Sequence, residues 1–581
     1  MNVALDNQFI YAMIVTMYVD IVPNRNSRPA ILLREAWRED GKIKKRTVAN
    51  ISAWPLEKVE VLRKILRNDY VVSAEQANLV IESSLPHGHV AAILGMIERL
   101  GLDRLIYSKR CRERGLVLAM IAERLLHPCS KLATTRMWHT TTLAEELGVE
   151  AADEDELYEA MDWLGGRQER IERGLAQRHL QEGGLVLYDA TSSYYEGRTC
   201  PLVRFGHSRD GKKGKPIIVY GVMTDGGGCP VAVEVYPGNT GDSKTVPDQV
   251  EKLRERFGLK RVVLVGDRGM LAETQLEVLK GYPGLGWVTA LRSQAIRQLV
   301  GQGLIQPSLF DQRNLAEISS PDYPGERLIV CFNPFLQEER KRKREELLSE
   351  TEKRLSRIAG EVARRTKTPL AAAEIGRKVG AVLNRYKVGK HFRLTIKDGV
   401  FRFERDEDAI SGEAALDGFY VIRTSEPKER LSPEDAVRAY KGLSAVERLF
   451  RTLKGIDILV RPIHHRGEER VKAHIFICLL AYYVEWHMRQ ALAPLLFDDE
   501  DKDKKRDPVA LAQPSPQAKE KKSRKKTRDG LPIHSFDTLL AELGTLCRNR
   551  CRMGISKNLP TFVRVTEKTT FQKKIFELLE M

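Results

Sequence analysis

Two aspartates stand at the ends of apolar runs that have the composition of buried strands. Leu185–Tyr188 lead into Asp189, and Val262–Val265, followed by a glycine, lead into Asp267. Continuous apolar runs of this length are typical of central strands covered on both faces. Open α/β sheets keep their active sites at the carboxyl ends of such strands. One carboxylate there would ordinarily be a turn former or a helix cap, but two in one small sheet indicate a site.

A third carboxylate is expected on a helix over residues 432–455. Ser432 at the N-cap, a proline after it and a glycine at the far end delimit this helix. At 100° per residue, Glu447 falls at the border between the apolar side and the solvent-facing side. Taken alone, this is an ordinary amphipathic helix with a charge at its boundary. Three further polar side chains lie within about 40° of one another and of Glu447: Tyr440, Arg451 and Lys454.

Together the three carboxylates predict a metal site. Carboxylate oxygens in a partly buried cluster repel one another unless a cation joins them, and an all-carboxylate set favours Mg²⁺, with Mn²⁺ as a substitute. Two such ions can activate a water or hydroxyl and stabilise the leaving oxygen of a phosphodiester. Asp189, Asp267 and Glu447 are therefore both the predicted metal ligands and the predicted catalytic residues.

The charge of the chain indicates a polyanionic partner. Its 581 residues carry a net charge of +16, and 42% of them are apolar, which suffices for a sizeable core. Such a cationic excess is typical of nucleic-acid-binding proteins, although a merely soluble basic protein would share it. The longest apolar run, Ile475–Val484, is too short to span a membrane and predicts a buried helix. The N-terminus lacks a secretory signal, so a cytoplasmic protein without a membrane partner is expected.

The eight cysteines are scattered, and only Cys547 and Cys551 lie close together. A single C-x3-C pair is a poor zinc signature, so free thiols in a reducing compartment are the better interpretation.

The periodicity of apolar residues divides the chain into segments. Strand runs in its middle alternate with helices in the order strand, hairpin, helix, strand, helix, strand. A long charged helix and a hairpin with an Asp-Gly turn then break this rhythm as an insertion. The expected segments are an N-terminal extension with a small antiparallel β sheet (1–55), a helical region (56–182), a first core part (183–292), an inserted helical arm and β-rich subdomain (293–430), a second core part (431–495), a charged disordered linker (496–530) and a helical tail (531–581).

These motifs resemble the DDE transposases of bacterial insertion sequences. The most specific sign is Y-x2-R-x3-E-x6-K, the signature of an IS4-like subgroup with a β-rich insertion before the glutamate. Here it contains Tyr440, Leu443, Glu447 and Lys454, so leucine replaces the arginine and one expected DNA-phosphate contact is missing or supplied elsewhere. The resemblance covers roughly residues 17–495. It implies an α/β fold, with a ribonuclease-H-like catalytic core interrupted by the insertion.

The resemblance also covers the aspartates and nearby basic residues. Asp189 in YDATSSYYEG and Asp267 in VGDRGM stand where the family has its first two catalytic carboxylates. It implies that Tyr440 and Lys454 hold the DNA end near the cleavage point. Residues 56–182 would form a DNA-binding region that helps to recognise the terminal inverted repeats. Further implied DNA contacts are Arg451, Arg268, Lys212, Lys213 and Lys215.

The implied activity is cut-and-paste transposition without a covalent protein–DNA intermediate. The enzyme would hydrolyse the 3′ ends of its element with divalent metal and join the freed 3′-OH to target DNA. Pairing two ends implies at least a homodimer. The partner would be double-stranded DNA rather than a small molecule, and the protein would be nucleoid-associated when bound.

Other classes of protein share part of this pattern. A metal-dependent nuclease would have the same carboxylates but no obvious need for the insertion. An inactive or repurposed transposase-derived DNA-binding protein would be favoured by a broken triad, and the triad is intact. A serine or tyrosine recombinase could use Ser192, Ser193 or Tyr194, yet no supporting arginine and histidine constellation accompanies them.

Two further groups are interpreted as structural or DNA-facing. His464 and His465 are adjacent in sequence and would point apart, so with His474 they favour such a role over metal binding. Trp287 is expected in the core rather than as a wedge between bases.

Overall fold

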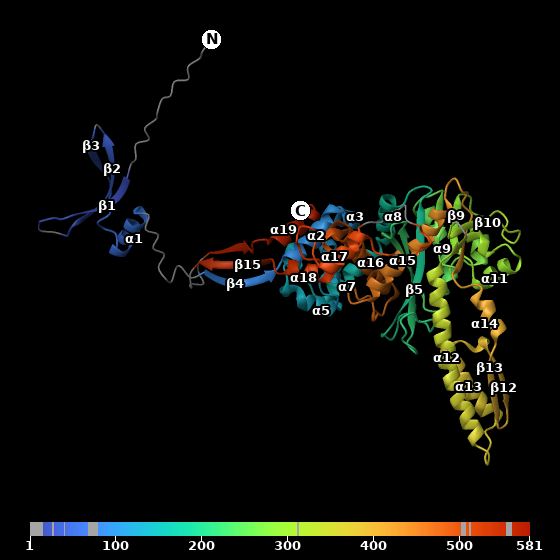
Figure 1. Ribbon diagram of the computed structural model, residues 1–581. Helices are drawn as coiled ribbons and strands as arrows, with labels where there is room; N and C mark the ends of the chain where they lie inside the picture. The colour runs from blue at the N-terminus through green and yellow to red at the C-terminus, as the bar shows by residue number, and fades with distance from the viewer. Residues whose placement is uncertain are drawn as a thin grey trace, which may run out of the picture. The chain divides into compact units, whose positions relative to one another are not determined.

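The computed structural model describes residues 16–25, 28–39, 41–67, 79–310, 313–500, 507–510, 513–553 and 560–581 (Figure 1). The chain divides into two compact units, Met1–Ser84 with Arg548–Thr566, and Leu85–Cys547 with Glu567–Met581. Residues 1–15 of the predicted N-terminal extension lie outside the described part. Among the described helices, none combines the length and the apolar composition that crossing a membrane requires.

The first unit contains a small antiparallel sheet where β-branched runs predict one. Its strands are β1 (Thr16–Val22), β2 (Ala30–Glu39) and β3 (Lys42–Asn50), and α1 (Leu56–Leu66) packs on them. A second sheet combines β4 (Leu79–Pro86), β15 (Cys547–Met553) and β16 (Thr561–Val565). The strands β15 and β16 lie where a helical tail is predicted. The sequence pattern misses them because β15 pairs with β4, which lies more than 450 residues earlier in the chain.

Helices fill residues 88–179. They are α2 (Gly88–Arg99), α3 (Leu102–Ile106), α4 (Arg112–Leu126), α5 (Lys131–Met137), α6 (Leu143–Leu147), α7 (Glu154–Gly165) and α8 (Gln168–His179). They surround α16 (Glu468–Leu492), which contacts α2, α4 and α7. All ten residues of the apolar run Ile475–Val484 are buried in α16, as the composition predicts.

One large mixed sheet forms the centre of the second unit. Its strand order is β10-β11-β14-β9-β8-β5-β6-β7. The strands β5, β6 and β7 pair antiparallel, whereas β5, β8 and β9 pair parallel. Their bounds are β5 Leu185–Tyr194, β6 Ile217–Asp225, β7 Pro230–Pro237, β8 Val262–Val265, β9 Leu285–Ala290, β10 Leu315–Ile318, β11 Arg327–Phe332 and β14 Phe419–Thr424.

Helices connect and cover the strands of this sheet. They are α9 (Val246–Glu251), continued by a π-helical turn (Lys252–Arg256), α10 (Glu273–Lys280), α11 (Ser293–Gly301) and α15 (Pro433–Lys454). Single 3-10 turns lie at Trp138–Thr140, Asp242–Thr245, Pro307–Phe310, Gly389–His391 and Ala493–Leu495. The N-cap of α15 is the predicted one, because the Ser432 hydroxyl accepts from the Asp435 amide at 3.1 Å.

The insertion is only partly a separate subdomain. Its strands β10, β11 and β14 extend the central sheet, which the sequence does not predict, because pairing between β14 and β9 joins residues about 130 positions apart. The rest forms an arm of α12 (Pro334–Arg364), α13 (Ala372–Tyr386), β12 (Phe392–Lys397), β13 (Val400–Arg405) and α14 (Glu407–Ala414). Figure 1 shows α12 and α13 side by side. Leu348, Leu355, Ile375 and Val379 are among the residues of the arm's own core.

The chain after α16 also differs from the prediction. Where a disordered linker is expected over 496–530, Pro516–Arg524 form α17, and α18 (Phe536–Gly544) and α19 (Thr570–Leu578) follow. The Ser515 amide and hydroxyl both donate to Asp499 at 2.7 Å, and Lys521 pairs with Glu500 at 2.8 Å. The composition of this segment suggests that its charged side chains are solvated. In the structure, Asp499, Glu500 and Lys521 instead form contacts within the fold. Residues 501–506 and 511–512 of this segment lie outside the described part.

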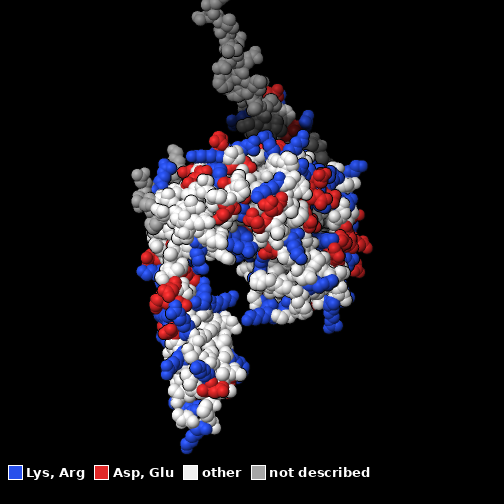
Figure 2. All heavy atoms as spheres, turned by 90° about the vertical axis from the view of Figure 1, so that its right-hand side faces the viewer, with Lys and Arg blue, Asp and Glu red and all other residues white. Residues whose placement is uncertain are grey.

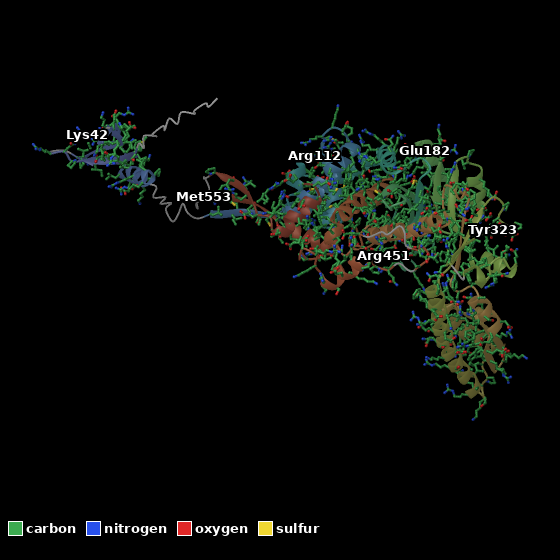
Figure 3. The ribbon with its side chains drawn as sticks, turned by 45° about the horizontal axis from the view of Figure 1, so that its top comes forward. Lys42, Arg112, Glu182, Tyr323, Arg451 and Met553 are labelled. Atoms are coloured by element: carbon green, nitrogen blue, oxygen red, sulfur yellow. The ribbon has the colours of Figure 1, made fainter. Side chains whose placement is uncertain are left out.

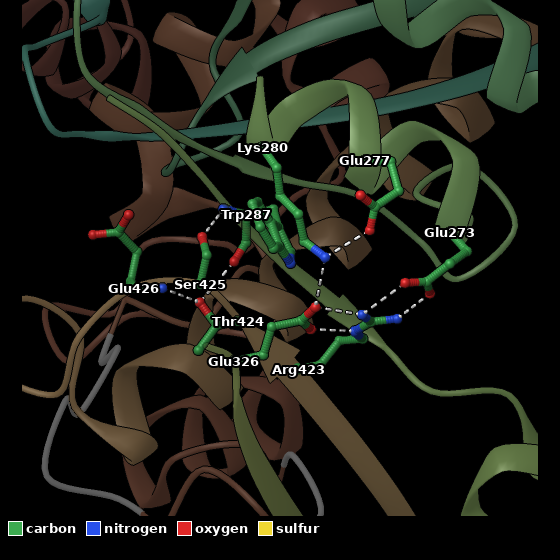
Figure 4. Close-up of polar contacts among 9 residues, drawn as sticks. All are labelled: Glu273, Glu277, Lys280, Trp287, Glu326, Arg423, Thr424, Ser425 and Glu426. Atoms are coloured by element: carbon green, nitrogen blue, oxygen red, sulfur yellow. Dashed lines mark hydrogen bonds and ion pairs between the residues drawn. The ribbon is translucent and has the colours of Figure 1, made fainter. Parts of the chain in front are cut away.

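A polar network joins the returning strand β14 to the rest of the sheet (Figure 4). Arg423 on β14 forms paired hydrogen bonds of 2.6 Å with Glu326, and also contacts Glu273 at the start of α10 at 2.7 Å. The side chains of Arg423 and Glu326 are 6% and 2% exposed. Next to them, the Thr424 hydroxyl donates to the carbonyl of Trp287 on β9 at 2.6 Å. Trp287 is buried, as predicted.

Arg423→Met should destabilise the second unit by about 3–5 kcal/mol, because it leaves the buried Glu326 carboxylate with only Lys280, at 3.8 Å, in place of the paired hydrogen bonds from Arg423. Urea unfolding followed by tryptophan fluorescence measures the change. Arg430→Met is the matched control, since Arg430 is 60% exposed and lies 3.9 Å from Glu426. That surface pair should contribute only about 0–1 kcal/mol. Equal effects of the two substitutions would contradict the assignment.

Candidate functional site

The pairing of β5 with β8 brings the two predicted aspartates together. In this parallel ladder Leu187 lies opposite Val265. Asp189 comes two residues after Leu187, and Asp267 comes two residues after Val265. The two neighbouring strands therefore carry their aspartates at matching positions along the ladder. Neighbouring strands lie about 4.8 Å apart, and residues two apart along a strand share a face.

The local environments of these carboxylates differ. Asp189 is half-buried within β5, and its Oδ1 accepts a 2.7 Å hydrogen bond from the amide of Ala190. Asp267 is exposed, and its Oδ1 accepts from the amides of Gly269 at 3.0 Å and Met270 at 2.7 Å. Burial, followed by the charge of Asp267, raises the pKa of Asp189 to about 7. The charge of Asp267 thus disfavours the ionised form of Asp189.

Helix α15, which carries Glu447, packs along β5, the strand that carries Asp189. Near its middle, a Cβ on Gly442 would lie 3.4 Å from Leu187. At its end, the Lys454 ammonium donates to the hydroxyl of Thr191 at 2.7 Å. Leu187 and Thr191 flank Asp189 on one face of the strand. Glu447 lies on α15 between these two contacts and is exposed.

The charges of all three carboxylates affect the pKa of Tyr440. Its ring is half-buried, and burial, then the charge of Asp267 and also those of Glu447 and Asp189, raise the pKa of its hydroxyl. Leu443, which replaces the arginine of the signature, is 8% exposed and packs in the core. Position 443 in this chain therefore cannot contribute a phosphate contact.

Lys454, a predicted DNA contact, is held inside the fold. Its ammonium donates to the Ser192 carbonyl at 2.6 Å and pairs with Asp210 at 3.1 Å. The side chains of Lys454 and Asp210 are 10% and 1% exposed. Arg461 also pairs with Asp210, at 2.5 Å, and the Asp210 carboxylate accepts from the Tyr194 amide at 2.9 Å. Burial lowers the pKa of Lys454.

Asp210 is the residue of this site that the sequence does not single out. It lies in the basic loop GHSRDGKKGK, where a lone aspartate among cations is the available signal. Its buried carboxylate fastens this loop to the end of α15 and to β5.

The other predicted DNA contacts lie at the surface. Arg268 and Arg451 are exposed, and Figure 3 labels Arg451. Lys212, Lys213 and Lys215 are exposed in the loop; the ammonium of Lys212 lies 5.9 Å from the ring centre of Tyr194, and Lys215 pairs with Glu196 at 3.3 Å. Figure 2 shows Lys and Arg side chains gathered along the hollow between the main body and the arm.

The hydroxyls at the end of β5 are engaged within the fold. The Ser192 hydroxyl donates to the carbonyl of His207 at 3.2 Å and accepts from the amide of Arg209 at 3.1 Å. Ser193 is fully buried and shares a 3.0 Å hydrogen bond with the hydroxyl of Tyr220. These contacts favour structural roles over nucleophilic ones.

A different set of metal-type ligands lies elsewhere in the second unit. One ligand atom each of His179, Cys229 and His487 lie within 4.8 Å of one another. The Cys229 sulfur is 3.8 Å from His487 Nε2, and His179 Nε2 is 3.0 Å from the hydroxyl of Tyr483. These hydrogen bonds account for the cluster. The Cys547 thiol donates to the carbonyl of Gly544 at 3.8 Å, and Cys551 is a buried cysteine outside any disulfide.

Two family models match the chain, and both describe transposases. Residues 181–484, more than half of the chain, match the family model "Transposase DDE domain", and residues 19–77 match "IS1634 family transposase, N-terminal domain". Among solved structures the chain is similar to a cryo-EM structure of the piggyBac transposase synaptic complex with hairpin DNA. That similarity has 9% identity and a TM-score of 0.32 over 78% of this chain and 76% of that chain, too low to support an argument. No curated protein matches the chain.

Removing Asp210 should release the basic loop. In Asp210→Asn, Lys454 and Arg461 lose their shared counter-charge, so trypsin should cut at Lys212 and Lys213 faster than in the unchanged protein. Mass spectrometry of the fragments measures the rate. Glu196→Gln is the matched control, because it removes only the exposed partner of Lys215.

A double-mutant cycle with Lys454→Met tests the same contact energetically. Residues that share a salt bridge are expected to couple by about 0.5–3 kcal/mol in unfolding free energy. Strictly additive effects of Asp210→Asn and Lys454→Met, with unchanged loop cleavage, would rule out this role for Asp210.

Proposed function

The chain belongs to the DDE transposases, and on that premise we propose that it cuts the 3′ ends of its own insertion sequence and joins them to target DNA. The observation that supports the proposal is that β5, with Asp189, pairs with β8, which precedes Asp267, while α15, with Glu447, packs on β5, and the charges of all three carboxylates act on Tyr440. The matched family region, residues 181–484, contains all three.

The strand order supports a ribonuclease-H-like core. The five strands β7-β6-β5-β8-β9 lie side by side, with an antiparallel β5–β6–β7 meander on one side and the parallel β8 and β9 on the other. This arrangement is the one expected of such a core. We assign the chain to the Y-x2-R-x3-E-x6-K subgroup, in a variant with Leu443 buried in place of the arginine.

The donor set fits Mg²⁺ or Mn²⁺. Hard carboxylate oxygens suit these ions, and a half-buried Asp189 beside a second carboxylate is stabilised in its charged form by a cation. Asp189, Asp267 and Glu447 would hold the metal. When bound, two such ions lower the pKa of an attacking water or hydroxyl and stabilise the leaving oxygen of the phosphodiester.

The side chains around the carboxylates would orient the DNA. Tyr440 borders all three carboxylates, so its half-buried ring would pack against the strand at the point of cleavage. The exposed Arg268 and Arg451 would contact phosphates. Lys454 acts through Asp210 and Thr191 as a positioning residue that holds the loop and the helix end against β5.

The partners we propose are double-stranded DNA and a second copy of the chain. Element ends and target would both be bound as duplexes, and the pairing of two ends requires at least a dimer. The first unit and helices α2–α8 would help to recognise the terminal inverted repeats. The net charge of +16 supports a polyanionic partner.

Transposition in cells is the primary test. A marker placed between the native flanks of the gene is supplied with the unchanged protein, with Glu447→Gln or with Glu434→Gln, and new junctions are sequenced. Glu434→Gln is the matched control, because it makes the same change in the first turn of the same helix. We expect new insertions with the unchanged and control proteins only.

Purified protein tests the chemistry. Asp189→Asn, Asp267→Asn and Glu447→Gln should each reduce cleavage and joining of end fragments by at least about 10³-fold while leaving binding of these fragments largely intact, since each removes one metal ligand. EDTA should abolish both steps and Mg²⁺ should restore them. Near-normal joining by one variant would remove that residue from the site. Cleavage without joining by the unchanged protein would favour a nuclease.

A further inference from the structure

A basic pocket lies beside the carboxylate site. Its volume is about 570 Å³, within the range of ligand-binding cavities. The wall combines residues of α4, α5, α7, α16 and the segment 459–467, and Asp155 of α7 is the one acidic residue among those that line it. The polar side chains that carry the argument are Arg124, Lys131, Arg461, Arg466, Arg470 and His474.

Two cations in this wall are buried without a counter-ion. Arg124 is 5% exposed and Lys131 is 4% exposed. The Arg124 guanidinium donates only long bonds to the carbonyls of Ile458 and Leu459, at 3.4 and 3.3 Å. Within the described ranges, neither side chain forms a salt bridge with a carboxylate. Burial and the charge of Arg124 lower the pKa of Lys131 to about 7.

Burying a charge is expensive unless an opposite charge accompanies it. Two adjacent buried cations without a carboxylate are therefore explained if an anion enters from outside the chain. Arg461 and Arg470 in the same wall do have partners, Asp210 at 2.5 Å and Asp162 at 3.1 Å. The contrast shows that this region can pair its arginines, and that Arg124 and Lys131 are exceptions.

A buried histidine adds a free polar atom to the wall. His474 is 4% exposed, and its Nε2 donates to the carbonyl of Val460 at 2.9 Å. Its Nδ1 is buried without a hydrogen-bond partner. A buried nitrogen of this kind is normally satisfied by a protein group, a water or a ligand.

The pocket is connected to the carboxylate site through short contacts. Arg461 joins Asp210, Asp210 joins Lys454, and Lys454 joins Thr191, two residues after Asp189. The wall segment is also tied to β5 directly, because the Ile463 amide donates to the carbonyl of Tyr194, the last residue of β5, at 3.3 Å. A strand lying across Asp189 would therefore pass close to the pocket.

We propose that this pocket binds a backbone phosphate of the DNA strand that enters the carboxylate site, a few nucleotides from the cut. Arg124, Lys131 and the exposed Arg466 at its rim supply the positive charge. The unpaired Nδ1 of His474 carries no proton, so it would accept a hydrogen bond from a water in the pocket rather than contact the phosphate. The assignment to DNA rests on the proposed function, and it gives Arg466 of the His-His-Arg motif at 464–466 a role in holding DNA.

The test measures how DNA-end binding depends on salt. The full chain carries Glu447→Gln, so cleavage does not complicate binding, and the probe is a labelled duplex with the native end sequence. Each phosphate contact contributes about 0.9 to the slope of log K against log salt concentration. Lys131→Met and Arg124→Met should each lower the slope by about one and weaken binding roughly tenfold at low salt.

Matched controls make the same substitutions outside the pocket. Lys441 is a lysine that donates to the carbonyls of Val509 and Ala510, and Arg340 is an arginine that donates to those of Leu416 and Phe419. Lys441→Met and Arg340→Met should keep the slope. Arg466→Ala changes an exposed residue at the rim of the pocket, and it should also lower the slope of log K against log salt concentration. Because this substitution does not alter a buried side chain, it tests the proposal even if Arg124→Met or Lys131→Met fails to fold.

The outcomes separate the pocket from the proposed function. Unchanged slopes in all three pocket variants would overturn the phosphate contact even if the protein transposes. Thermal stabilisation by inorganic phosphate that Lys131→Met abolishes, with unchanged DNA slopes, would assign the pocket to a free anion and also overturn it. A chain that binds no end DNA at all would refute the proposed function, and the assignment to DNA with it.

Discussion

The parallel pairing of β5 with β8 is the constraint on which the rest of the site depends. With Leu187 opposite Val265, the strands deliver Asp189 and Asp267 to one edge. Burial, followed by the charge of Asp267, raises the pKa of Asp189, so both effects disfavour its charged form unless a cation or a counter-charge offsets them. The apolar residues before each aspartate are fully enclosed, so the register cannot slip by one position without burying a carboxylate.

The helix that carries Glu447 is positioned by contacts at both of its ends. The insertion returns through β14, whose Arg423 pairs with Glu326 and Glu273, and the chain then enters α15 at Pro433. At the other end, Lys454 binds β5 and Asp210. Glu447 lies between these anchors. The insertion therefore does more than add an arm, because its strands extend the sheet from which α15 starts.

Charge is distributed unevenly around this frame. Near the carboxylates, Asp210 neutralises Lys454 and Arg461, so these cations serve the fold. In the basic pocket, Arg124 and Lys131 are buried and form no salt bridge with a carboxylate in the described part of the chain. Lys212, Lys213 and Lys215 are exposed in the loop GHSRDGKKGK. Internal pairing beside the reaction centre and unpaired cations just beyond it suit a surface along which a polyanion is held and positioned.

The sequence by itself determined the apolar strand runs that precede Asp189 and Asp267, the capped helix with Glu447 and the buried helix around Ile475–Val484, because strand and helix periodicity are local properties. It did not determine that β5 continues past Asp189 to Tyr194. Tertiary structure alone decided that Lys454 turns inward, that Leu443 lies in the core and that Asp210 is buried. It also decided that β14 pairs with β9, and that β15 pairs with β4. These depend on contacts between residues far apart in the chain, whose energies no local pattern records.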